Sequence, residues 1–299
     1  MGRALYDAVP AARLVFEEVD EALGAPLSRV IFEGPEEQLR LTEHAQPALM
    51  ATSLAAVRAL EAGGGRRVGE LCALLAGHSL GEYSALAAAG SIAIGDAARL
   101  LRVRGRAMQE AVPVGEGAMA AILGLELQAV EQVAREASEV GVCDLANDNA
   151  PGQAVVSGSR AAVERAVDLA KAQGARRSVL LPVSAPFHCR LLAPAAEAVR
   201  AALAGIQIRA PAVPVVTNVT ARPETAPEVL RARLVEQVIA RVRWRESLLA
   251  MAELGVETII ELGAGRVLSG LVKRTLAGVA TVALGTPDEI DAFVAALGS

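Results

Sequence analysis

A Gly-x-Ser-x-Gly pentapeptide at residues 77–81 is the strongest chemical signal in the sequence. It follows an apolar run and precedes helix-forming residues, so a strand and a helix would meet at Ser79 in a sharp turn that the flanking glycines make sterically possible. The Leu80 backbone amide and the helix dipole would then face a negative charge developing on an attacked carbonyl. We predict Ser79 as a nucleophile; a Gly/Ser turn between two buried elements is the alternative.

A serine nucleophile needs a base, and His188 is the best candidate among the three histidines. His78 adjoins Ser79 and should point away from its hydroxyl, so we expect it to line the pocket, whereas His44 lies among polar residues and is expected at the surface. His188 follows residues 181–187, whose two prolines forbid a helix and force an extended loop. We predict His188 as the general base, with a purely structural histidine as the alternative.

A further group must hold the imidazole in the correct tautomer. In hydrolases with a serine, aspartate, histidine order, the carboxylate lies between the other two residues in the chain. Asp144, Asp148 and Asp168 lie in that interval, but all three fall in a predicted small domain. A backbone carbonyl could orient the ring as well, so the sequence leaves both possibilities open.

Arg104 is the remaining residue of chemical interest. It lies in a basic helical segment in which Arg102 and Arg106 fall on other faces of the helix. Turned inward, Arg104 would need a buried anion, most simply a substrate carboxylate held by two parallel hydrogen bonds. A solvated basic face is the alternative, and the segment alone favours it.

The composition argues against several classes of protein. The 299 residues are 53% hydrophobic and 2% aromatic, so a large core must be built from Ala, Val and Leu. A net charge of -5 without blocks of like charge argues against nucleic-acid binding. The apolar runs are broken well short of the ~20 residues that a membrane span requires.

Cysteine usage indicates a reducing compartment. Cys72, Cys143 and Cys189 are odd in number and form no Cys-x-x-Cys pair. A disulfide scaffold or a zinc site is therefore not expected. Because no signal peptide is recognisable ahead of the first helix, we expect a cytoplasmic protein without a metal.

Apolar periodicity predicts an α/β fold in two parts. Helices are expected at residues 3–23, 47–62 and 94–112, with a flexible Gly-Gly-Gly link at residues 63–65 into the strand before Ser79. Residues 118–183 then follow the order strand, helix, strand, strand, helix, strand, which is typical of a ferredoxin-like unit. Beyond residue 187, helices and strands alternate, which indicates a mostly parallel sheet with helices on both faces.

These features resemble the malonyl-CoA:acyl-carrier-protein transacylase family of fatty-acid synthesis along essentially the whole chain. Several long motifs stand in the right order, which makes the resemblance specific. The matching segments are Gln46-Pro47-Ala48-Leu49, Gly77-His78-Ser79-Leu80-Gly81-Glu82-Tyr83-Ser84-Ala85-Leu86, Arg104-Gly105-Arg106-Ala107-Met108-Gln109-Glu110-Ala111-Val112-Pro113, Asn147-Asp148-Asn149-Ala150-Pro151-Gly152-Gln153, Val183-Ser184-Ala185-Pro186-Phe187-His188-Cys189 and Glu261-Leu262-Gly263-Ala264-Gly265.

The resemblance implies a role for each candidate residue. Ser79 would be the acylated nucleophile, His188 its base and Arg104 the group that binds the malonyl carboxylate. The Gln237 backbone carbonyl would orient His188. Two further residues would line the acyl pocket, Asn147 along its wall and Phe187 beside the acyl α-carbon.

The resemblance also implies a fold and a reaction. It supports an α/β-hydrolase-like core with a ferredoxin-like insertion. The change of rhythm near Pro113 and Pro186 places the core at residues 1–113 and 187–299 and the small domain at residues 114–186. The reaction would be a ping-pong transfer of malonyl from malonyl-CoA to the phosphopantetheine thiol of acyl-carrier protein, with no bound cofactor. We expect a monomer that binds the carrier transiently and binds neither nucleic acid nor membrane.

The first residues depart from the family pattern. Family members begin with a short strand and a Gly-Gln-Gly-Ser-Gln loop, and this sequence starts at Met1-Gly2-Arg3, just past that point. The loop normally lends a second amide to the oxyanion hole, and the strand normally pairs inside the core sheet. Unpaired backbone and uncovered apolar surface are therefore expected, and we favour a start codon placed too far downstream.

Two other functions are kept as alternatives. A serine esterase or thioesterase would use water in place of the carrier thiol, and an N-terminally truncated form of low activity would only bind the carrier. An acidic carrier would need a local basic patch. Arg266, Lys273 and Arg274 are the candidates for it, although a solvated helix face explains them equally well.

Overall fold

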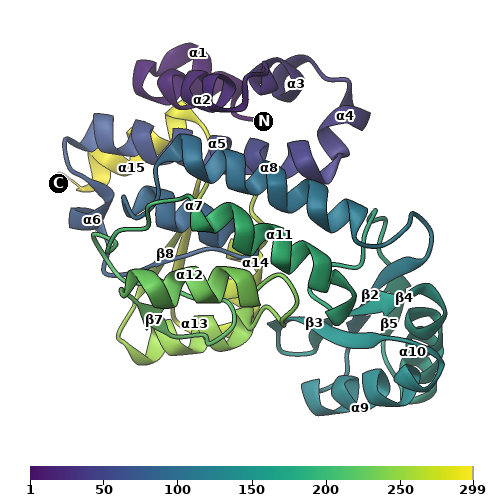
Figure 1. Cartoon of the computed structure of the whole chain (residues 1–299). Coiled ribbons are helices and arrows are strands. Elements are labelled where there is room, and N and C mark those ends of the chain that lie inside the picture. Colours follow the sequence, from purple (N-terminus) through teal and green to yellow (C-terminus); the bar gives the residue numbers. More distant parts are fainter. Residues whose placement is uncertain (298–299) are drawn as a thin grey trace.

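The computed structural model describes residues 1–297 and has an α/β architecture, in which a helix-rich core carries a small four-stranded sheet at one end (Figure 1). The N-terminal helices α1 (Arg3–Ala8) and α2 (Pro10–Leu23) pack on the long helices α5 (Thr42–Gly64) and α8 (Ile94–Glu110). Alanines dominate the buried face of α5, and such small side chains let neighbouring helices approach closely. This close packing compensates for the scarcity of aromatic residues.

Helix α5 differs from the prediction at both ends. It begins at Thr42, so Pro47 lies inside the helix, and it continues to Gly64. The proline removes one backbone donor, but residues 46–48 are buried, and their packing outweighs that cost. The predicted flexible link is also wrong, because the short helix α6 (Val68–Leu71) stands between α5 and the strand before Ser79.

The small sheet has the predicted order of elements. Its strands pair antiparallel in the order β3-β4-β2-β5, and α9 and α10 pack on one face. Along the second half of β2, Ala120 and Ile122 contact these helices, whereas Met119 and Ala121 face the opposite side with Phe187. The elements are β2 (Gly117–Leu123), α9 (Leu127–Ala137), β3 (Cys143–Ala150), β4 (Gln153–Ser159), α10 (Arg160–Ala172) and β5 (Arg177–Leu180).

The core contains two pairs of parallel strands. Strand β1 (Leu75–Ala76) pairs with β6 (Val215–Val216), which also pairs antiparallel with β7 (Pro223–Glu224). Strand β8 (Thr258–Leu262) pairs in parallel with β9 (Ala280–Leu284). The remaining helices are α3 (Leu27–Glu33), α4 (Glu36–Arg40), α7 (Gly81–Ala88), α11 (Ala193–Ala204), α12 (Pro227–Glu236), α13 (Trp244–Glu253), α14 (Val267–Thr275) and α15 (Pro287–Leu297), with 3-10 turns at Ser138–Val140 and Arg190–Leu192.

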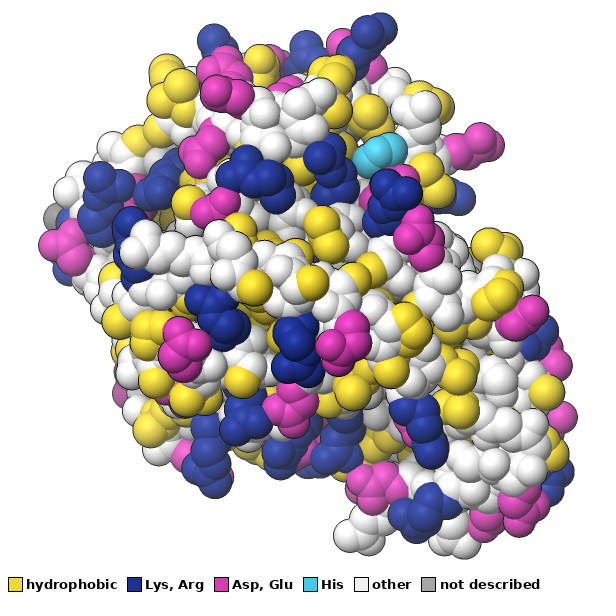
Figure 2. Space-filling model, viewed as in Figure 1, with side chains coloured by type: hydrophobic (Ala, Val, Ile, Leu, Met, Phe, Trp, Pro, Cys, Tyr) yellow, Lys and Arg dark blue, Asp and Glu magenta, His cyan; other side chains and the backbone are white. Residues whose placement is uncertain are grey.

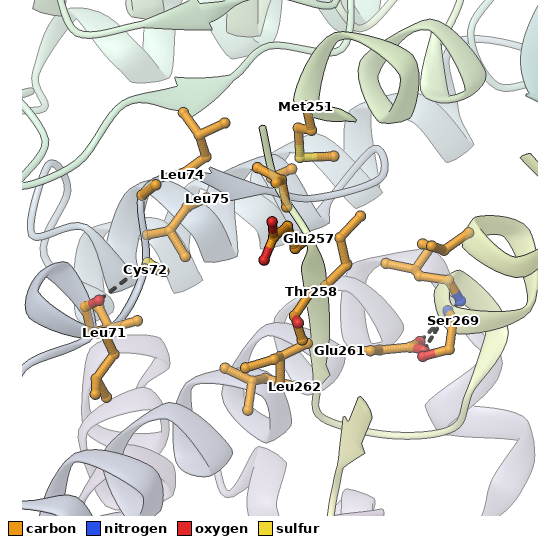
Figure 3. Close-up of a pocket in the computed structure, with 18 of the residues that line it drawn as sticks. Leu71, Cys72, Leu74, Leu75, Met251, Glu257, Thr258, Glu261, Leu262 and Ser269 are labelled. Carbon is orange, nitrogen blue, oxygen red and sulfur yellow. Dashed lines mark hydrogen bonds between the residues drawn. The ribbon is translucent and has the colours of Figure 1, made fainter. Parts of the chain in front are cut away.

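A cavity of about 580 Å³ separates the two parallel pairs (Figure 3). Leu74 and Leu75 line one wall, and Thr258 and Leu262 of β8 line another. Within residues 1–297, one edge of β1 and one edge of β8 have no partner strand. Unpaired strand backbone and uncovered apolar surface thus coincide here. The cavity contains neither Ser79 nor His188, so the chemistry lies elsewhere.

No helix within residues 1–297 has both the length and the hydropathy needed to cross a bilayer.

Candidate active site

The predicted strand, turn and helix around Ser79 are confirmed. Strand β1 ends at Ala76 and α7 begins at Gly81, and Ser79 has a left-handed φ of 55°. A Cβ on Gly77 would lie 1.9 Å from the Gly81 carbonyl oxygen, so only glycine fits there. The turn therefore presents the Ser79 side chain at the start of α7. The Leu80 amide donates no hydrogen bond within the described residues and is free to face an oxyanion.

Asn218 holds this turn in place. The Ser79 amide donates to Asn218 Oδ1 over 2.6 Å, and Asn218 Nδ2 donates to the Gly77 carbonyl over 2.7 Å. Asn218 itself is fully buried just after β6. A non-glycine residue with positive φ costs roughly 1–3 kcal/mol. These two hydrogen bonds help to offset that cost at the nucleophile.

His188 lies beside the serine, as the sequence predicts. Its Nε2 is 2.8 Å from Ser79 Oγ, and its Nδ1 is 2.8 Å from the Gln237 backbone carbonyl oxygen. Since a carbonyl oxygen only accepts, Nδ1 carries the proton and Nε2 is left to accept one from the serine. His188 also has a left-handed φ of 57°, and its side chain is buried.

The three aspartates considered for orienting the imidazole lie elsewhere. Asp144 pairs with Arg190, Asp148 with Arg245, and Asp168 with Lys171. The Gln237 carbonyl occupies the position that a triad carboxylate would otherwise take. A neutral acceptor leaves less negative charge near the ring than a carboxylate does.

Burial lowers the pKa of His188 to about 3, and the neighbouring charge of Arg104 adds to the shift. The ring is therefore neutral near pH 7, which is the form that accepts a proton.

Arg104 is buried, with 2% of its surface exposed, so the interpretation as a solvated basic face is wrong. The reason is the close approach of α8 to α5: a Cβ on Gly105 would lie 2.5 Å from the Thr42 carbonyl oxygen. The guanidinium donates to Gln46 Oε1 over 2.6 Å, to Gln237 Oε1 over 2.9 Å and to Ser79 Oγ over 3.0 Å.

Within residues 1–297, no carboxylate pairs directly with the charge of Arg104. Its hydrogen-bond acceptors among the described residues are amide and hydroxyl oxygens, and its Nε has no partner there. Burial lowers the pKa of the guanidinium, and a desolvated cation is costly unless an anion joins it. The site therefore favours an acyl group that carries its own negative charge beside Ser79.

Of the other predicted site residues, His78 and Phe187 adjoin Ser79 and His188 in the chain, and Asn147 lies in the small sheet. His78 Nε2 lies 2.8 Å from Asn149 Oδ1, and burial lowers the pKa of His78. Asn147 is buried in β3. Phe187 contacts both the main core and the face of the small sheet opposite α9 and α10, so it lies at the junction of the two. Among residues 1–297, no group of three or more His, Cys, Asp or Glu side chains is arranged to hold a metal ion.

Three polar residues of the site had no role in the sequence prediction. Gln46 and Glu82 lie within quoted motifs, but nothing local distinguishes them from surface residues on a helix. Asn218 follows a two-residue strand and contacts Ser79 across 139 positions of sequence. Only tertiary structure could reveal its role.

Known proteins are similar to this chain along nearly its whole length. The family "Acyl transferase domain" matches residues 1–296. The malonyl CoA-acyl carrier protein transacylase of Bacillus subtilis is 46% identical over 99% of this chain and 92% of its own length, and that of Escherichia coli K12 is 45% identical over 95% and 90%. Among solved structures, an acyl-carrier-protein-S-malonyltransferase from Bartonella henselae superposes with a TM-score of 0.97 at 50% identity, covering 100% of this chain and 95% of the other.

A further solved structure is a type II PKS acyl-carrier protein in complex with its malonyl-transacylase, with a TM-score of 0.95 at 40% identity over 99% of this chain and 94% of that one. The matches extend through the core and the small sheet alike. On the strength of this similarity in sequence and structure, the chain belongs to the acyl transferase family, and within it to the malonyl-CoA:acyl-carrier-protein transacylases.

Proposed function

We infer that the protein transfers a malonyl group from malonyl-CoA to the phosphopantetheine thiol of acyl-carrier protein, in fatty-acid synthesis. One observation carries the choice of substrate. The buried guanidinium of Arg104 lies 3.0 Å from Ser79 Oγ and has no carboxylate partner of its own among the described residues. A malonyl carboxylate would supply that partner while its thioester carbonyl meets the serine.

The reaction has two half-reactions of the same kind. His188 Nε2 takes the Ser79 proton as the oxygen attacks the thioester carbonyl, and the Leu80 amide stabilises the resulting oxyanion. The carbon–sulfur bond breaks, the proton passes to the CoA sulfur, and malonyl-Ser79 remains. The carrier thiol then gives its proton to His188 and attacks the ester. Ser79 recovers its proton, and the malonyl group leaves on the carrier.

A serine thioesterase would share these groups, and the lifetime of the acyl-enzyme separates the two functions. After mixing with malonyl-CoA and removal of free thioester, malonyl-Ser79 should persist in buffer and disappear when holo acyl-carrier protein is added. Malonyl should then appear on the carrier. Release of free malonate without the carrier, as fast as transfer with it, would instead identify a hydrolase.

The pH dependence follows from His188. Its pKa is lowered from an ordinary value near 6.5 to about 3, so the neutral base persists as pH falls through the range where a free histidine would become protonated. We expect kcat/KM for malonyl-CoA to stay nearly flat between about pH 7 and about pH 5, because this ratio reports ionisations of the free enzyme. A half-maximal loss near pH 6.5 would contradict the assignment.

Phe187 is proposed to narrow the pocket beside the acyl α-carbon. Its ring packs at the junction of the core and the small sheet, next to His188 in the chain. Replacing Phe187 by Ser should raise the methylmalonyl-CoA to malonyl-CoA ratio of kcat/KM by roughly 10-fold, as expected for room for one methyl group. Both thioesters are compared on both proteins. An unchanged ratio in a folded variant would contradict this role.

Carrier docking is proposed to use exposed basic residues of the α14 region. Lys and Arg alternate with Asp and Glu over the face seen in Figure 2, so a local cluster must supply any positive patch. Arg266 pairs with Glu289, and Arg274 donates to Gln153, while both stay exposed.

Replacing the three basic residues of the α14 region by alanine, in the variant R266A/K273A/R274A, should raise the KM for acyl-carrier protein several-fold. It should leave the KM for malonyl-CoA unchanged. A control of equal charge change replaces three exposed arginines of the N-terminal helices and should alter neither KM. Equal effects of the two variants would contradict the location. The variants are R266A/K273A/R274A and R3A/R29A/R40A.

The cellular setting is proposed on the same basis. We propose a cytoplasmic monomer that binds no resident cofactor and meets the carrier only transiently, with residues 114–186 as a separate small domain. The division into domains is supported by a separate apolar core in that segment, which its strands form together with α9 and α10.

A further inference from the structure

Glu82 is a buried carboxylate that the mechanism above does not use. It lies in the first turn of α7 and is completely inaccessible to solvent. Its Oε2 accepts hydrogen bonds from the Asn218 amide over 3.0 Å and from Gln237 Nε2 over 2.7 Å. Its Oε1 has no partner among the described residues. Burying a carboxylate costs free energy unless hydrogen bonds and a partner charge compensate for the lost water.

The two donors to Glu82 are the residues that hold the reacting groups. Gln237 orients His188 through its backbone carbonyl and accepts from Arg104 through Oε1, and its Nε2 also donates to the Ser79 carbonyl. The amide plane of a glutamine can rotate by half a turn, and the oxygen and nitrogen atoms then exchange positions. Glu82 accepts from Nε2 and therefore keeps Oε1 turned toward Arg104.

Asn218 completes the connection to the nucleophile. Its backbone amide is held by Glu82 and its side chain is held by the Ser79 turn. One carboxylate oxygen thus contacts two of the residues that hold Ser79, His188 and Arg104, although Glu82 is within hydrogen-bond distance of none of these three side chains.

We propose that Glu82 is a positioning residue that fixes the Gln237 side chain and the Asn218 backbone and, through these two residues, aligns Arg104 and His188 with Ser79. The proposal rests on the proposed malonyl transfer. Its specific consequence is that Glu82 contributes to the preference for malonyl over acyl groups without a carboxylate, because Gln237 Oε1 is one of the acceptors that hold the guanidinium.

The positioning role of Glu82 depends on an acceptor oxygen at this position and not on the negative charge of the carboxylate. Burial raises the pKa of Glu82 to about 7, while the hydrogen bonds from Asn218 and Gln237 and the charge of Arg104 act against that shift. A protonated carboxyl keeps an acceptor oxygen, so the Asn218 and Gln237 contacts survive in both states. A glutamine should therefore serve in place of Glu82.

Three substitutions separate reach, charge and volume. E82Q keeps the acceptor at the same reach and removes the charge. E82D keeps the charge and withdraws it by one methylene. E82M keeps the volume and removes both acceptor oxygens. It therefore still tests the loss of the acceptor if the shorter side chain of E82D prevents folding.

The test is the ratio of kcat/KM for malonyl-CoA to that for acetyl-CoA, measured on variants whose thermal unfolding is also recorded. We expect E82Q to keep this ratio within about threefold of the unsubstituted protein, and E82D and E82M to lower it at least tenfold. A general loss of stability would lower both rates and leave the ratio unchanged. An unchanged ratio in both E82D and E82M, or a fall in E82Q as large as theirs, would overturn the proposal.

The same assay distinguishes this proposal from the proposed function. If the unsubstituted protein does not prefer malonyl-CoA, the proposed function fails. If it prefers malonyl-CoA and E82D and E82M do so equally, only the role of Glu82 fails.

Discussion

Replacing His188 by alanine is expected to slow formation of malonyl-Ser79 by on the order of 10⁴- to 10⁶-fold, the range found when a base of this type is removed from a serine enzyme. The imidazole lies 2.8 Å from Ser79 Oγ, and no other titratable base within hydrogen-bond distance of that oxygen could replace it among the described residues. Arg104 also contacts Oγ but only donates. Rapid quenching of single turnovers with malonyl-CoA measures the rate.

The control for this substitution is His44→Ala. The His44 ring contacts the Gln38 carbonyl and not the serine, so its loss should leave the acylation rate within a few-fold. The midpoint of thermal unfolding, measured for His188→Ala and for the unsubstituted protein, tests whether the variant is folded. A folded His188→Ala protein that acylates within tenfold of the normal rate would exclude His188 as the base.

Replacing Arg104 by methionine is expected to reverse the choice of acyl group. Methionine fills a similar volume without charge, so the malonyl carboxylate would enter a buried site with no cation. Two charged hydrogen bonds of about 1.5–3 kcal/mol each would be lost, which corresponds to roughly 10²- to 10⁴-fold in kcat/KM for malonyl-CoA. Acetyl-CoA, which has no carboxylate to place, should lose little or gain. Steady-state rates with the two thioesters measure the change.

Arg106→Met is the matched control, because Arg106 lies on the same helix but is exposed and pairs with Glu110. It should leave both thioesters unaffected. Arg104→Lys should fall between the two, because an ammonium cannot form the two parallel hydrogen bonds of a guanidinium. An equal loss for malonyl-CoA and acetyl-CoA in Arg104→Met would show that the arginine supports the fold of the site and not its selectivity.

The elbow and the small sheet were predictable because local physics determines them. Glycines on both sides of Ser79 permit a sharp turn, and the flanking residues allow only a strand before it and a helix after it. In the small sheet, alternate residues of each strand face opposite sides, and this period of two is visible in residues 118–122.

The interior position of Arg104 was not predictable from its own helix. The periodicity of α8 leaves either face available, and the choice is made where Gly105 allows the backbone of α5 to approach. The family resemblance, and not the segment itself, indicated that Arg104 binds a substrate. Helix ends such as that of α5 were similarly misjudged, because buried packing overrode the usual meaning of a proline.

The hydrogen-bond network that supports the reacting groups could not be predicted from the sequence. Gln237, Asn218 and Glu82 come from separate elements and acquire meaning only through contacts with one another. Glu82 lies in the motif around Ser79, but its spacing from the serine does not indicate that it contacts Gln237 and Asn218. The hydrogen bonds of the structure identify them, because most buried polar atoms are hydrogen-bonded and these three residues satisfy one another.

The most direct test of the account is the intact mass of the protein after brief mixing with malonyl-CoA, for the unsubstituted chain and for Ser79→Ala. We predict a stoichiometric gain of one malonyl group that vanishes in Ser79→Ala and is discharged by holo acyl-carrier protein. A malonyl adduct that survives in Ser79→Ala would contradict the assignment of the nucleophile, and the absence of any adduct on the unsubstituted chain would contradict a covalent mechanism.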